Sequence, residues 1–362
     1  AALPTIRYVL EHGGKAILMS HLGRPKGKRV KRLSLSPVAV ELSQLLDQQV
    51  HFAPDSIGAE TVKMVSSMSN GEVILLENLR FHSEEEQNDD EFAHALAQLG
   101  DIYINDAFGA AHRAHASTVG ITHHIEESAI GYLMKLELEF LGNLLVDPAK
   151  PFAAVLGGAK VSDKIKVIEN LLHHVQMLFI GGGMACTFLK AMGYEIGDSL
   201  LEEGSIEVSQ EILKVTKEKK IPLLLPTDCV IAEKLEANAS TKIVRVEDGV
   251  PQGWKILDIG PETIRRFKER LVEAKTIFWN GPMGVFEIKA FAAGTFGIAQ
   301  TMVESSAKGT ITVIGGGDSA AAVQQMGVAK EMTHISTGGG ASLEYLEGKA
   351  LPGVEAIRIK KK

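Results

Sequence analysis

The sequence has 362 residues, which is enough for two domains that each bury a full core. Its 45% hydrophobic and 23% charged residues are ordinary for a globular protein. The formal net charge of −7 argues against a general nucleic-acid binder, and the absence of an apolar run of about 18 residues argues against a transmembrane helix. With two cysteines, no disulfide framework and no secretory signal in the sequence, we expect a cytoplasmic protein with reduced thiols.

Seven short apolar runs punctuate the chain, and each ends at a loop of distinctive composition. Such runs predict strands buried on both faces of parallel sheets. The first three, at 16–20, 73–76 and 102–105, open onto basic loops. The last four, at 153–156, 178–180, 277–279 and 312–314, open onto glycine-rich loops. We therefore expect an α/β protein of two doubly wound parallel-sheet domains, with ligands at the carboxyl ends of the strands.

Helix signals lie between these runs. Ser83 and Glu86 have the spacing of a capping box, which predicts one helix running on through 91–99. Residues 132–146 show apolar residues at helical spacing where the loop chemistry changes, so we expect an interdomain helix there. The expected domains are 1–133 and 148–340, joined by a helix at 134–147, with 341–362 returning to the first domain.

The basic loops carry cations suited to an anionic ligand. His21 and Arg24 follow the first run, and Arg80 and Arg113 follow the next two. The planar guanidinium of arginine pairs bidentately with phosphate or carboxylate oxygens. The recurrence at three strand ends favours one shared site, although each arginine could instead pair with an acid at the surface.

The glycine loops fit neither the Walker pattern nor the G-x-G-x-x-G pattern, which disfavours a Walker ATPase and a standard dinucleotide-binding domain. Glycines after four strands could let backbone amides approach phosphates. Asp318 could hold Mg²⁺ or could simply be a helix N-cap. Lys160 and Lys164, four residues apart, would share one face of a helical turn, and Glu287 could accept hydrogen bonds from ribose hydroxyls.

Nine motifs together carry a family resemblance. In chain order they are SHLGRP, LLENLRF, NDAFGAAHRAHAS, GGAKVSDK, IGGGMA, LDIGPET, WNGPMGVFE, GGGDS and STGGGAS. In this order they resemble the phosphoglycerate kinases over nearly the whole chain. The resemblance implies two α/β domains joined by a helix and a hinge. It also implies reversible, Mg²⁺-dependent phosphoryl transfer between 1,3-bisphosphoglycerate and ADP, which gives 3-phosphoglycerate and ATP in glycolysis, by a monomer that needs no membrane or nucleic acid.

The resemblance also implies the site residues, motif by motif. Substrate binding would fall to His21, Leu22, Gly23, Arg24, Arg80, His112 and Arg113. Nucleotide binding would fall to Gly158, Lys160, Lys164, Gly181, Gly182, Gly183, Asn280, Pro282, Glu287, Gly316, Gly317, Asp318 and Ser319, with Asp318 also on the metal. Lys164, Gly317 and Gly339 would act on the transferred phosphoryl group.

One departure concerns the beginning of the sequence. Family members open with a strand bearing a V-D-F-N motif and a catalytic arginine, whereas this sequence opens at the helix that follows them. We expect the first strand of the first domain to be missing and activity to be impaired. Two alternatives are a truncated form that binds nucleotide without turnover, and a different nucleotide-dependent kinase or a dehydrogenase on an α/β scaffold.

Overall fold

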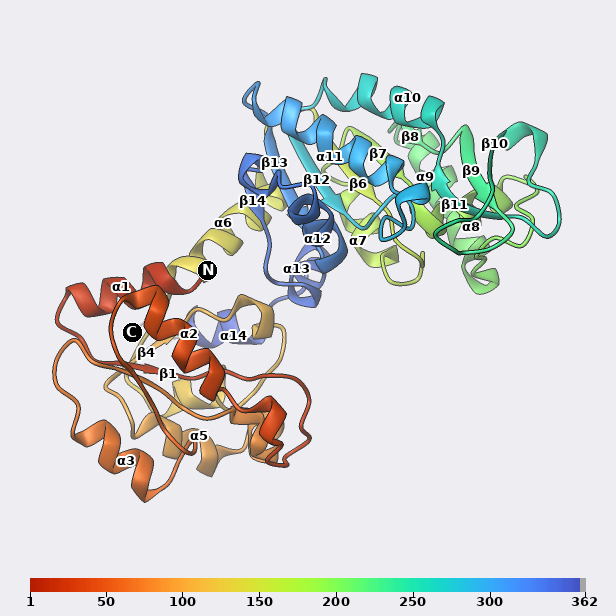
Figure 1. The fold of residues 1–362 in the computed structure, drawn as a ribbon. Coiled ribbons are helices and arrows are strands. Elements are labelled where there is room, and N and C mark those ends of the chain that lie inside the picture. Colours follow the sequence, from red (N-terminus) through yellow and green to blue (C-terminus); the bar gives the residue numbers. More distant parts are fainter. Residues whose placement is uncertain (359–362) are drawn as a thin grey trace. The chain divides into compact units, whose positions relative to one another are not determined.

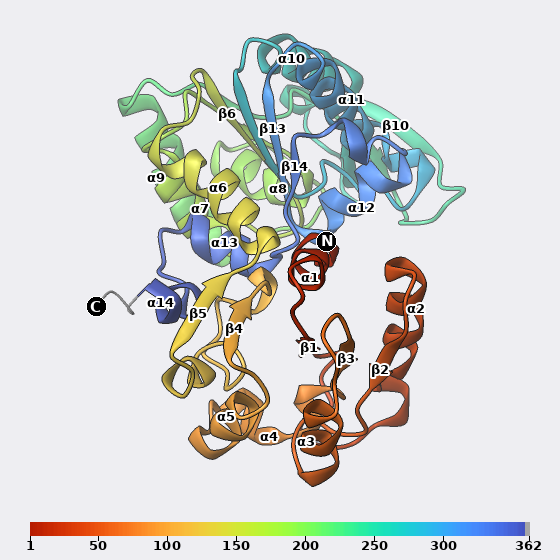
Figure 2. The same ribbon diagram turned by 90° about the vertical axis from the view of Figure 1, so that its left-hand side faces the viewer.

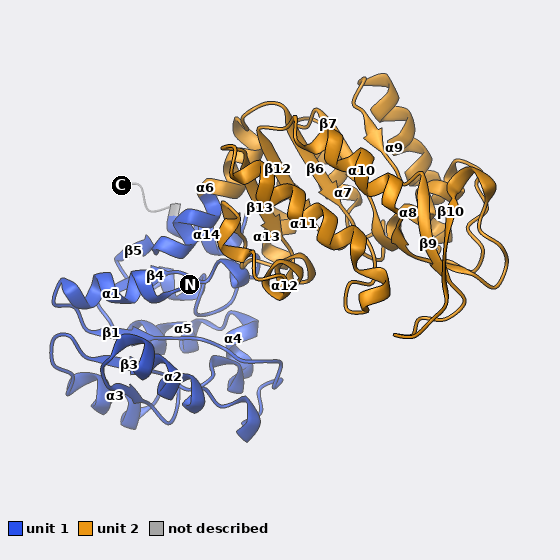
Figure 3. Ribbon diagram, turned by 45° about the horizontal axis from the view of Figure 1, so that its top comes forward, with its two compact units in different colours: residues 1–138, 350–362 blue, residues 139–349 orange. Residues whose placement is uncertain are grey.

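A computed structural model describes residues 1–358 of the chain (Figure 1). The chain forms two compact units (Figure 3). Unit 1 contains Ala1–Leu138 and the segment that begins at Ala350, and unit 2 contains Glu139–Lys349. The division falls within helix α6 (Tyr132–Val146). No helix in the described part of the chain is long and apolar enough to cross a bilayer.

Unit 1 has two small parallel sheets with helices around them. One sheet has the strand order β1-β3-β2, and the other pairs β4 with β5. The strands are β1 (Ala16–Leu18), β2 (Val50–Phe52), β3 (Val73–Leu75), β4 (Ile102–Asn105) and β5 (Glu127–Ile130). The helices are α1 (Leu3–Glu11), α2 (Ser36–Leu46), α3 (Ala59–Ser66), α4 (Ser83–Gln87), α5 (Asp90–Ala97) and α14 (Pro352–Arg358), with short 3₁₀ turns η1 (Lys31–Leu33), η2 (Leu79–Phe81), η3 (Phe108–Ala110) and η4 (Gly120–His123).

Unit 2 is built on a six-stranded parallel sheet with the order β14-β13-β12-β6-β7-β8, and β9 pairs antiparallel with both β10 and β11 in a separate sheet. The strands are β6 (Phe152–Leu156), β7 (Met177–Ile180), β8 (Leu223–Leu224), β9 (Asp228–Ala232), β10 (Thr241–Arg245), β11 (Lys255–Ile259), β12 (Thr276–Asn280), β13 (Ile311–Gly315) and β14 (His334–Ile335). The helices are α7 (Ile165–Leu171), α8 (Gly182–Ala191), α9 (Ile206–Glu218), α10 (Pro261–Leu271), α11 (Ala293–Ser306), α12 (Gly317–Gln325) and α13 (Gly340–Leu346), with 3₁₀ turns η5 (Glu203–Ser205), η6 (Val246–Asp248), η7 (Lys289–Phe291) and η8 (Ala329–Glu331).

The strand order of unit 2 reverses between β6 and β12. From β6 the chain adds β7 and β8 on one side, and from β12 it adds β13 and β14 on the other. Every residue of β6, β7 and β12 is buried, and the core beside them holds Trp279 and an edge-to-face pair of Phe179 and Phe267 with ring centroids 5.1 Å apart. This buried sheet fixes where the loops at the strand ends lie. The reversal is the place where open α/β sheets bind ligands.

All seven apolar runs form strands, which confirms the α/β prediction. The expectation of burial on both faces is wrong for β4, because Ile102 and Ile104 are exposed while Tyr103 and Asn105 are buried. The parallel strands of the first domain do not all join one sheet. Since β4 pairs only with β5, the strands of unit 1 fall into two sheets.

The predicted capping box at Ser83 is wrong. The hydroxyl of Ser83 donates to the side chain of Glu84, and helix α4 ends at Asn88, whose backbone is left-handed with φ 54°. A new helix, α5, then starts beside Asp89, whose carboxylate accepts a hydrogen bond of 2.9 Å from the amide of Phe92. The chain therefore makes two helices where one was expected, because a left-handed residue interrupts the helical path.

Residues 341–349 were expected to return to the first domain, but they lie in unit 2. Helix α13 packs on α7, and Asn170 Nδ2 donates to the carbonyl of Leu346 at 2.8 Å. The return to unit 1 comes with α14, which lies beside β5 (Figure 2). There the amide of Gly353 donates to the carbonyl of Ala111 at 2.9 Å.

Candidate functional site

The basic loops of β1 and β3 lie together because these two parallel strands are neighbours. The amide of Leu79 donates to the carbonyl of Ser20 at 3.1 Å, which joins the two loops just beyond the strands. Arg80 Nη1 then donates to the carbonyl of Gly23 at 3.1 Å. Arg80 and the segment from His21 to Arg24 therefore lie together in unit 1, as a candidate site requires.

The electrostatic surroundings of two histidines extend this site to the third basic loop. Burial, together with the charges of Arg80 and His115, lowers the pKa of His21 to about 4. Burial also lowers the pKa of His115, with smaller contributions from Arg80, Arg113 and His112. Both imidazoles are therefore neutral near pH 7, and the positive charge of the site resides on the arginines.

The alternative that each arginine pairs with a surface acid applies in part to Arg80. Its Nε lies 3.6 Å from Glu86 Oε1, and the side chain of Arg80 is only 14% exposed. Arg24, Leu22 and Arg113 are exposed. Of the three arginines expected at the site, Arg80 is therefore largely buried and held by Gly23 and Glu86, and the other two are exposed.

The glycine loops of unit 2 meet at the reversal of the strand order. The amide of Gly157, after β6, donates to the carbonyl of Asn280 at the end of β12, at 3.0 Å. The amide of Gly158 donates to the carbonyl of Pro282 at 2.9 Å. Gly182, with φ 66°, lies so close that a Cβ on it would be 2.6 Å from the nitrogen of Gly158. These glycines allow three loops to pack backbone against backbone.

The expected use of these amides to bind phosphate is therefore wrong for several glycines. The N–H groups of Gly157, Gly158, Gly181 and Gly182 are already donated to carbonyl oxygens. A ligand could use the space that these glycines leave, but not those N–H groups. The first turn of α12 differs, since the leading amides of a helix have no partner within the helix.

Lys164 is the buried cation of this site. Its Nζ donates to the carbonyl of Asn280 at 2.9 Å and also contacts Asn280 Oδ1. Burial lowers the pKa of Lys164 to about 8, while the negative charges of Asp163 and Asp318 act in the opposite direction. Lys160 is exposed, and neither lysine lies within a helix, because α7 begins only at Ile165. The prediction that the two lysines share a helical face is wrong.

The N-terminus of α12 completes the arrangement. Gly316, with φ 86°, is the N-cap, so the suggestion that Asp318 is the N-cap is wrong. Asp318 lies exposed in the first turn near Lys164, and Ser319 is buried, with its hydroxyl accepting a hydrogen bond of 2.6 Å from the amide of Gly281. The Nδ2 group of Asn280 is buried without a hydrogen-bond partner among the described residues. A Cβ added at Gly316 would lie 2.9 Å from it.

The donor set for a metal is small. No cluster of three or more His, Cys, Asp or Glu side chains in residues 1–358 could hold a metal ion. The single exposed carboxylate of Asp318 fits a hard cation that takes most of its oxygen ligands from a bound phosphate and from water.

The other expected residues lie at loop positions of unit 2. Glu287 is exposed in the segment between β12 and α11, and Pro282 is in the same segment. Gly183 is in the first turn of α8, and Gly339, with φ 53°, is the N-cap of α13.

Sequence reasoning missed an aspartate that supports this segment. Asp258, on β11, is 1% exposed and accepts hydrogen bonds from the amides of Gly294 at 2.7 Å and Ile259 at 2.9 Å. It thereby caps α11, and burial raises its pKa to about 7. The motif LDIGPET drew attention to this stretch, but nothing in it pointed to a helix 35 residues further on that needs a cap.

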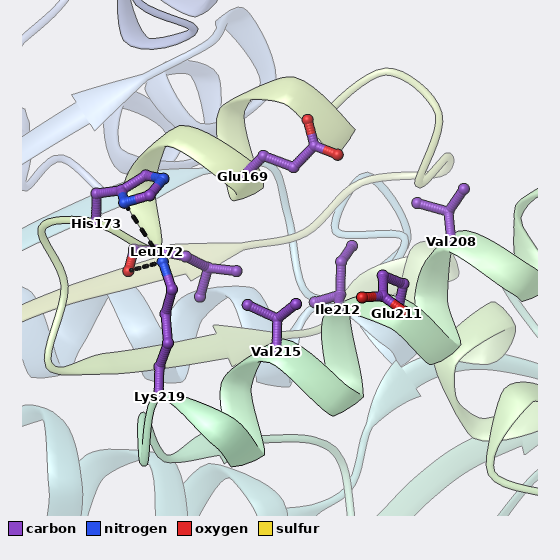
Figure 4. Close-up of a pocket in the computed structure, with 8 residues that line it drawn as sticks. All are labelled: Glu169, Leu172, His173, Val208, Glu211, Ile212, Val215 and Lys219. Atoms are coloured by element: carbon purple, nitrogen blue, oxygen red, sulfur yellow. Dashed lines mark hydrogen bonds between the residues drawn. The ribbon is translucent and has the colours of Figure 1, made fainter.

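A pocket of about 290 Å³ also lies between α7 and α9. Apolar side chains line its floor, and Lys219 Nζ at its rim lies 3.3 Å from His173 Nδ1 (Figure 4). None of the expected site residues lines this pocket.

Comparisons with known proteins identify the family of the chain. The family model described as phosphoglycerate kinase matches residues 1–349. The phosphoglycerate kinase of Moorella thermoacetica is 56% identical over 360 residues, which covers 99% of this chain and 90% of that protein. That of Chlorobium phaeobacteroides is 55% identical over 356 residues, which covers 98% of this chain and 89% of that protein.

Solved structures give the same result. The phosphoglycerate kinase from Coxiella burnetii superposes with a TM-score of 0.89 at 40% identity, covering 100% of this chain and 90% of that one. The enzyme from Pyrococcus horikoshii superposes with a TM-score of 0.85 at 33% identity, covering 99% of this chain and 90% of that one. These findings favour a phosphoglycerate kinase over a truncated nucleotide binder and over an unrelated kinase or dehydrogenase. The chain belongs to the phosphoglycerate kinase family.

Proposed function

We propose that this chain, as a glycolytic kinase, transfers a phosphoryl group reversibly between 1,3-bisphosphoglycerate and ADP, so that the carboxylate of 3-phosphoglycerate is the acceptor in the reverse direction. The observation that carries the proposal is the meeting of Lys164, Asn280 and the N-terminus of α12 at the strand reversal of unit 2. There a cation and helix amides face the position where a nucleotide phosphate would lie.

In unit 1, the proposed ligand is phosphoglycerate, which carries both a phosphate and a carboxylate. Arg24, Arg80 and Arg113 would supply charge-assisted hydrogen bonds to it. His21 would contribute a neutral imidazole whose nitrogens can donate or accept, His112 would contribute a further ring nitrogen, and Leu22 and Gly23 would shape the loop. Support comes from the bond of Arg80 to Gly23 and from the shared electrostatic surroundings of the histidines.

In unit 2, the proposed ligand is ATP or ADP. The first turn of α12, Gly316–Ser319, would receive the phosphates, and Lys160 and Lys164 would neutralise them. Glu287 would accept from the ribose hydroxyls, and Gly158, Gly181–Gly183, Pro282 and Asn280 would form the walls. When bound through Asp318, Mg²⁺ would supply positive charge that offsets the phosphate oxygens.

The proposed mechanism depends on positioning and charge, because phosphoryl transfer passes through a loose transition state with charge spread over three oxygens. Lys164 Nζ would leave its two oxygen partners on Asn280 and contact the migrating group, whose negative charge would keep the lysine protonated. Gly317 and Gly339 would present backbone amides to that group. No general base is needed, since the acceptor oxygens are already anionic.

The experiment that tests this proposal is a coupled assay of the purified chain with MgATP and 3-phosphoglycerate, run beside other hydroxy acids and phosphorylated acids. We expect turnover of MgATP with 3-phosphoglycerate and with none of the other acids. Turnover that prefers another acid, or calorimetric binding of ADP with no turnover of any acid, would contradict the proposal. On the same family basis we propose a cytoplasmic monomer, which sedimentation can test.

A further inference from the structure

Asn78 is a buried residue of unit 1 that has no place in the site described above. It lies between β3 and η2, is 0% exposed, and uses both ends of its amide. Its Nδ2 donates to the carbonyl of Leu22 at 2.8 Å and to the carbonyl of Leu33 at 2.8 Å. Its Oδ1 accepts from the amide of Arg80 at 3.1 Å. The side chain is therefore fully engaged with the main chain of three separate segments.

The three partners of Asn78 enclose the proposed phosphoglycerate loop. Leu22 lies inside the loop, Leu33 ends the basic stretch that follows it, and Arg80 is the guanidinium that faces it. Arg80 Nη1 in turn donates to the carbonyl of Gly23, the residue after Leu22. The bonds thus make a closed ring from Asn78 to Leu22, on to Gly23 and Arg80, and back to Asn78.

We propose that Asn78 is a positioning residue that sets the distance between the loop at His21–Arg24 and the guanidinium of Arg80, and so sets the affinity for phosphoglycerate. This inference rests on the proposed function, since it takes phosphoglycerate as the ligand of that loop. Asn78 is 0% exposed, so its side chain would not touch the ligand. It acts by fixing two main-chain positions whose side chains do.

The chemistry of the amide explains why this residue type is required. Two carbonyls need donors and one amide needs an acceptor, and of the short side chains only asparagine offers two N–H groups and an oxygen on one plane. Aspartate keeps the acceptor but places a negative oxygen against two carbonyls. Serine can still accept from the Arg80 amide as an N-cap, but it is too short to reach both carbonyls.

Asn78→Ser separates two sets of bonds. Serine can still accept from the amide of Arg80, but it loses the bonds to the carbonyls of Leu22 and Leu33. Asn170→Ala is the matched control, because it deletes an amide-to-carbonyl bond of 2.8 Å to Leu346 in unit 2. We expect the Kd for 3-phosphoglycerate, measured by calorimetry, to rise about tenfold in Asn78→Ser and to stay within about twofold in the control. The Kd for MgADP should stay within about twofold in both.

Hydrogen exchange provides a readout that needs neither ligand nor activity. In Asn78→Ser, amides within residues 20–34 should lose protection, while β6 and β12 keep theirs. If Asn78→Ser does not fold, Asn78→Asp and Asn78→Ala are measured in the same way, and unfolding of all three at 25 °C counts against a role limited to positioning. An unchanged Kd for 3-phosphoglycerate with normal exchange at 20–34, or equal losses for both ligands, overturns the inference. A wild-type chain that does not bind 3-phosphoglycerate refutes the proposed function instead, and protection at 20–34 still decides whether Asn78 clamps the loop.

Discussion

Replacing Lys164 by methionine should remove activity without removing stability. The residue is 8% exposed, and burial lowers its pKa from 10.5 to about 8. A shift of this size corresponds to about 3 kcal/mol by which folding disfavours the charged lysine at pH 7. Against this stand the two bonds to Asn280, and hydrogen bonds to charged groups contribute about 1.5–3 kcal/mol each at most. Two such bonds at the lower end of that range contribute about 3 kcal/mol, which offsets the cost of burying the charge.

We therefore expect the free energy of unfolding of Lys164→Met, measured in urea at pH 7, to lie within about 1 kcal/mol of the wild-type value, because methionine fills a similar volume without a charge. The kcat should fall by about 10²–10³, the usual effect of losing one group that stabilises charge in the transition state. Lys160→Met is the matched control, since Lys160 is exposed, and its stability should not change.

The pH dependence gives a second test of the same reasoning. The folded state gives up the proton of Lys164 near pH 8, whereas the unfolded state keeps it until about pH 10.5. Over that interval the unfolded chain binds more protons, so wild-type stability should rise with pH relative to Lys164→Met. A Lys164→Met variant with a kcat within tenfold of the wild type would refute the assignment of Lys164 as a functional cation. A loss of several kcal/mol in its free energy of unfolding at pH 7 would refute the assignment too, because it would show that the lysine stabilises the fold.

Three further variants test other parts of the account. Arg113→Ala should raise the KM for 3-phosphoglycerate by about tenfold or more and leave the KM for ATP unchanged in steady-state assays, since only unit 1 loses a cation; an unchanged KM for 3-phosphoglycerate would exclude Arg113 from the site. Asp318→Asn should raise the Mg²⁺ concentration for half-maximal activity about tenfold, and an unshifted Mg²⁺ titration would argue that the metal is held without this carboxylate. Asp258, whose folded pKa is raised to about 7, contributes stability that is present below about pH 4 and lost as the pH rises through 7. Asp258→Asn should therefore remove up to about 4 kcal/mol of the change with pH in the free energy of unfolding, measured in urea over that interval. A pH dependence equal to that of the wild type would contradict the raised pKa of Asp258.

Local pattern was enough to predict the strands at the apolar runs. Residues such as Val155, Phe179 and Trp279 belong to short, continuous apolar stretches followed by glycines, which favour strands covered on both faces. The pattern failed for Ile102 and Ile104, because whether a face is covered depends on distant parts of the chain. The short strands β8 and β14 carry too few residues to give a period at all.

In the candidate site, too, local sequence predicted some features, and others depended on distant parts of the chain. The chemistry of Arg80 and Asp318 could be proposed from residue type and position after a strand. The structural role of Gly182 could not be proposed from the sequence. A glycine is required there because the backbone of Gly158 lies too close for a side chain, and that contact forms only when the chain folds. Likewise, the spacing of Lys160 and Lys164 suggested a shared face, but the turn before α7 directs Lys164 inward to Asn280. Such contacts join residues far apart in sequence.

A crystal structure of the chain with 3-phosphoglycerate and MgADP tests the central claim most directly. The account predicts electron density for phosphoglycerate against Arg24, Arg80 and Arg113, and density for the diphosphate at the first turn of α12 beside Lys164. Density for either ligand elsewhere, for example in the pocket between α7 and α9, with these residues left without contact, would contradict it.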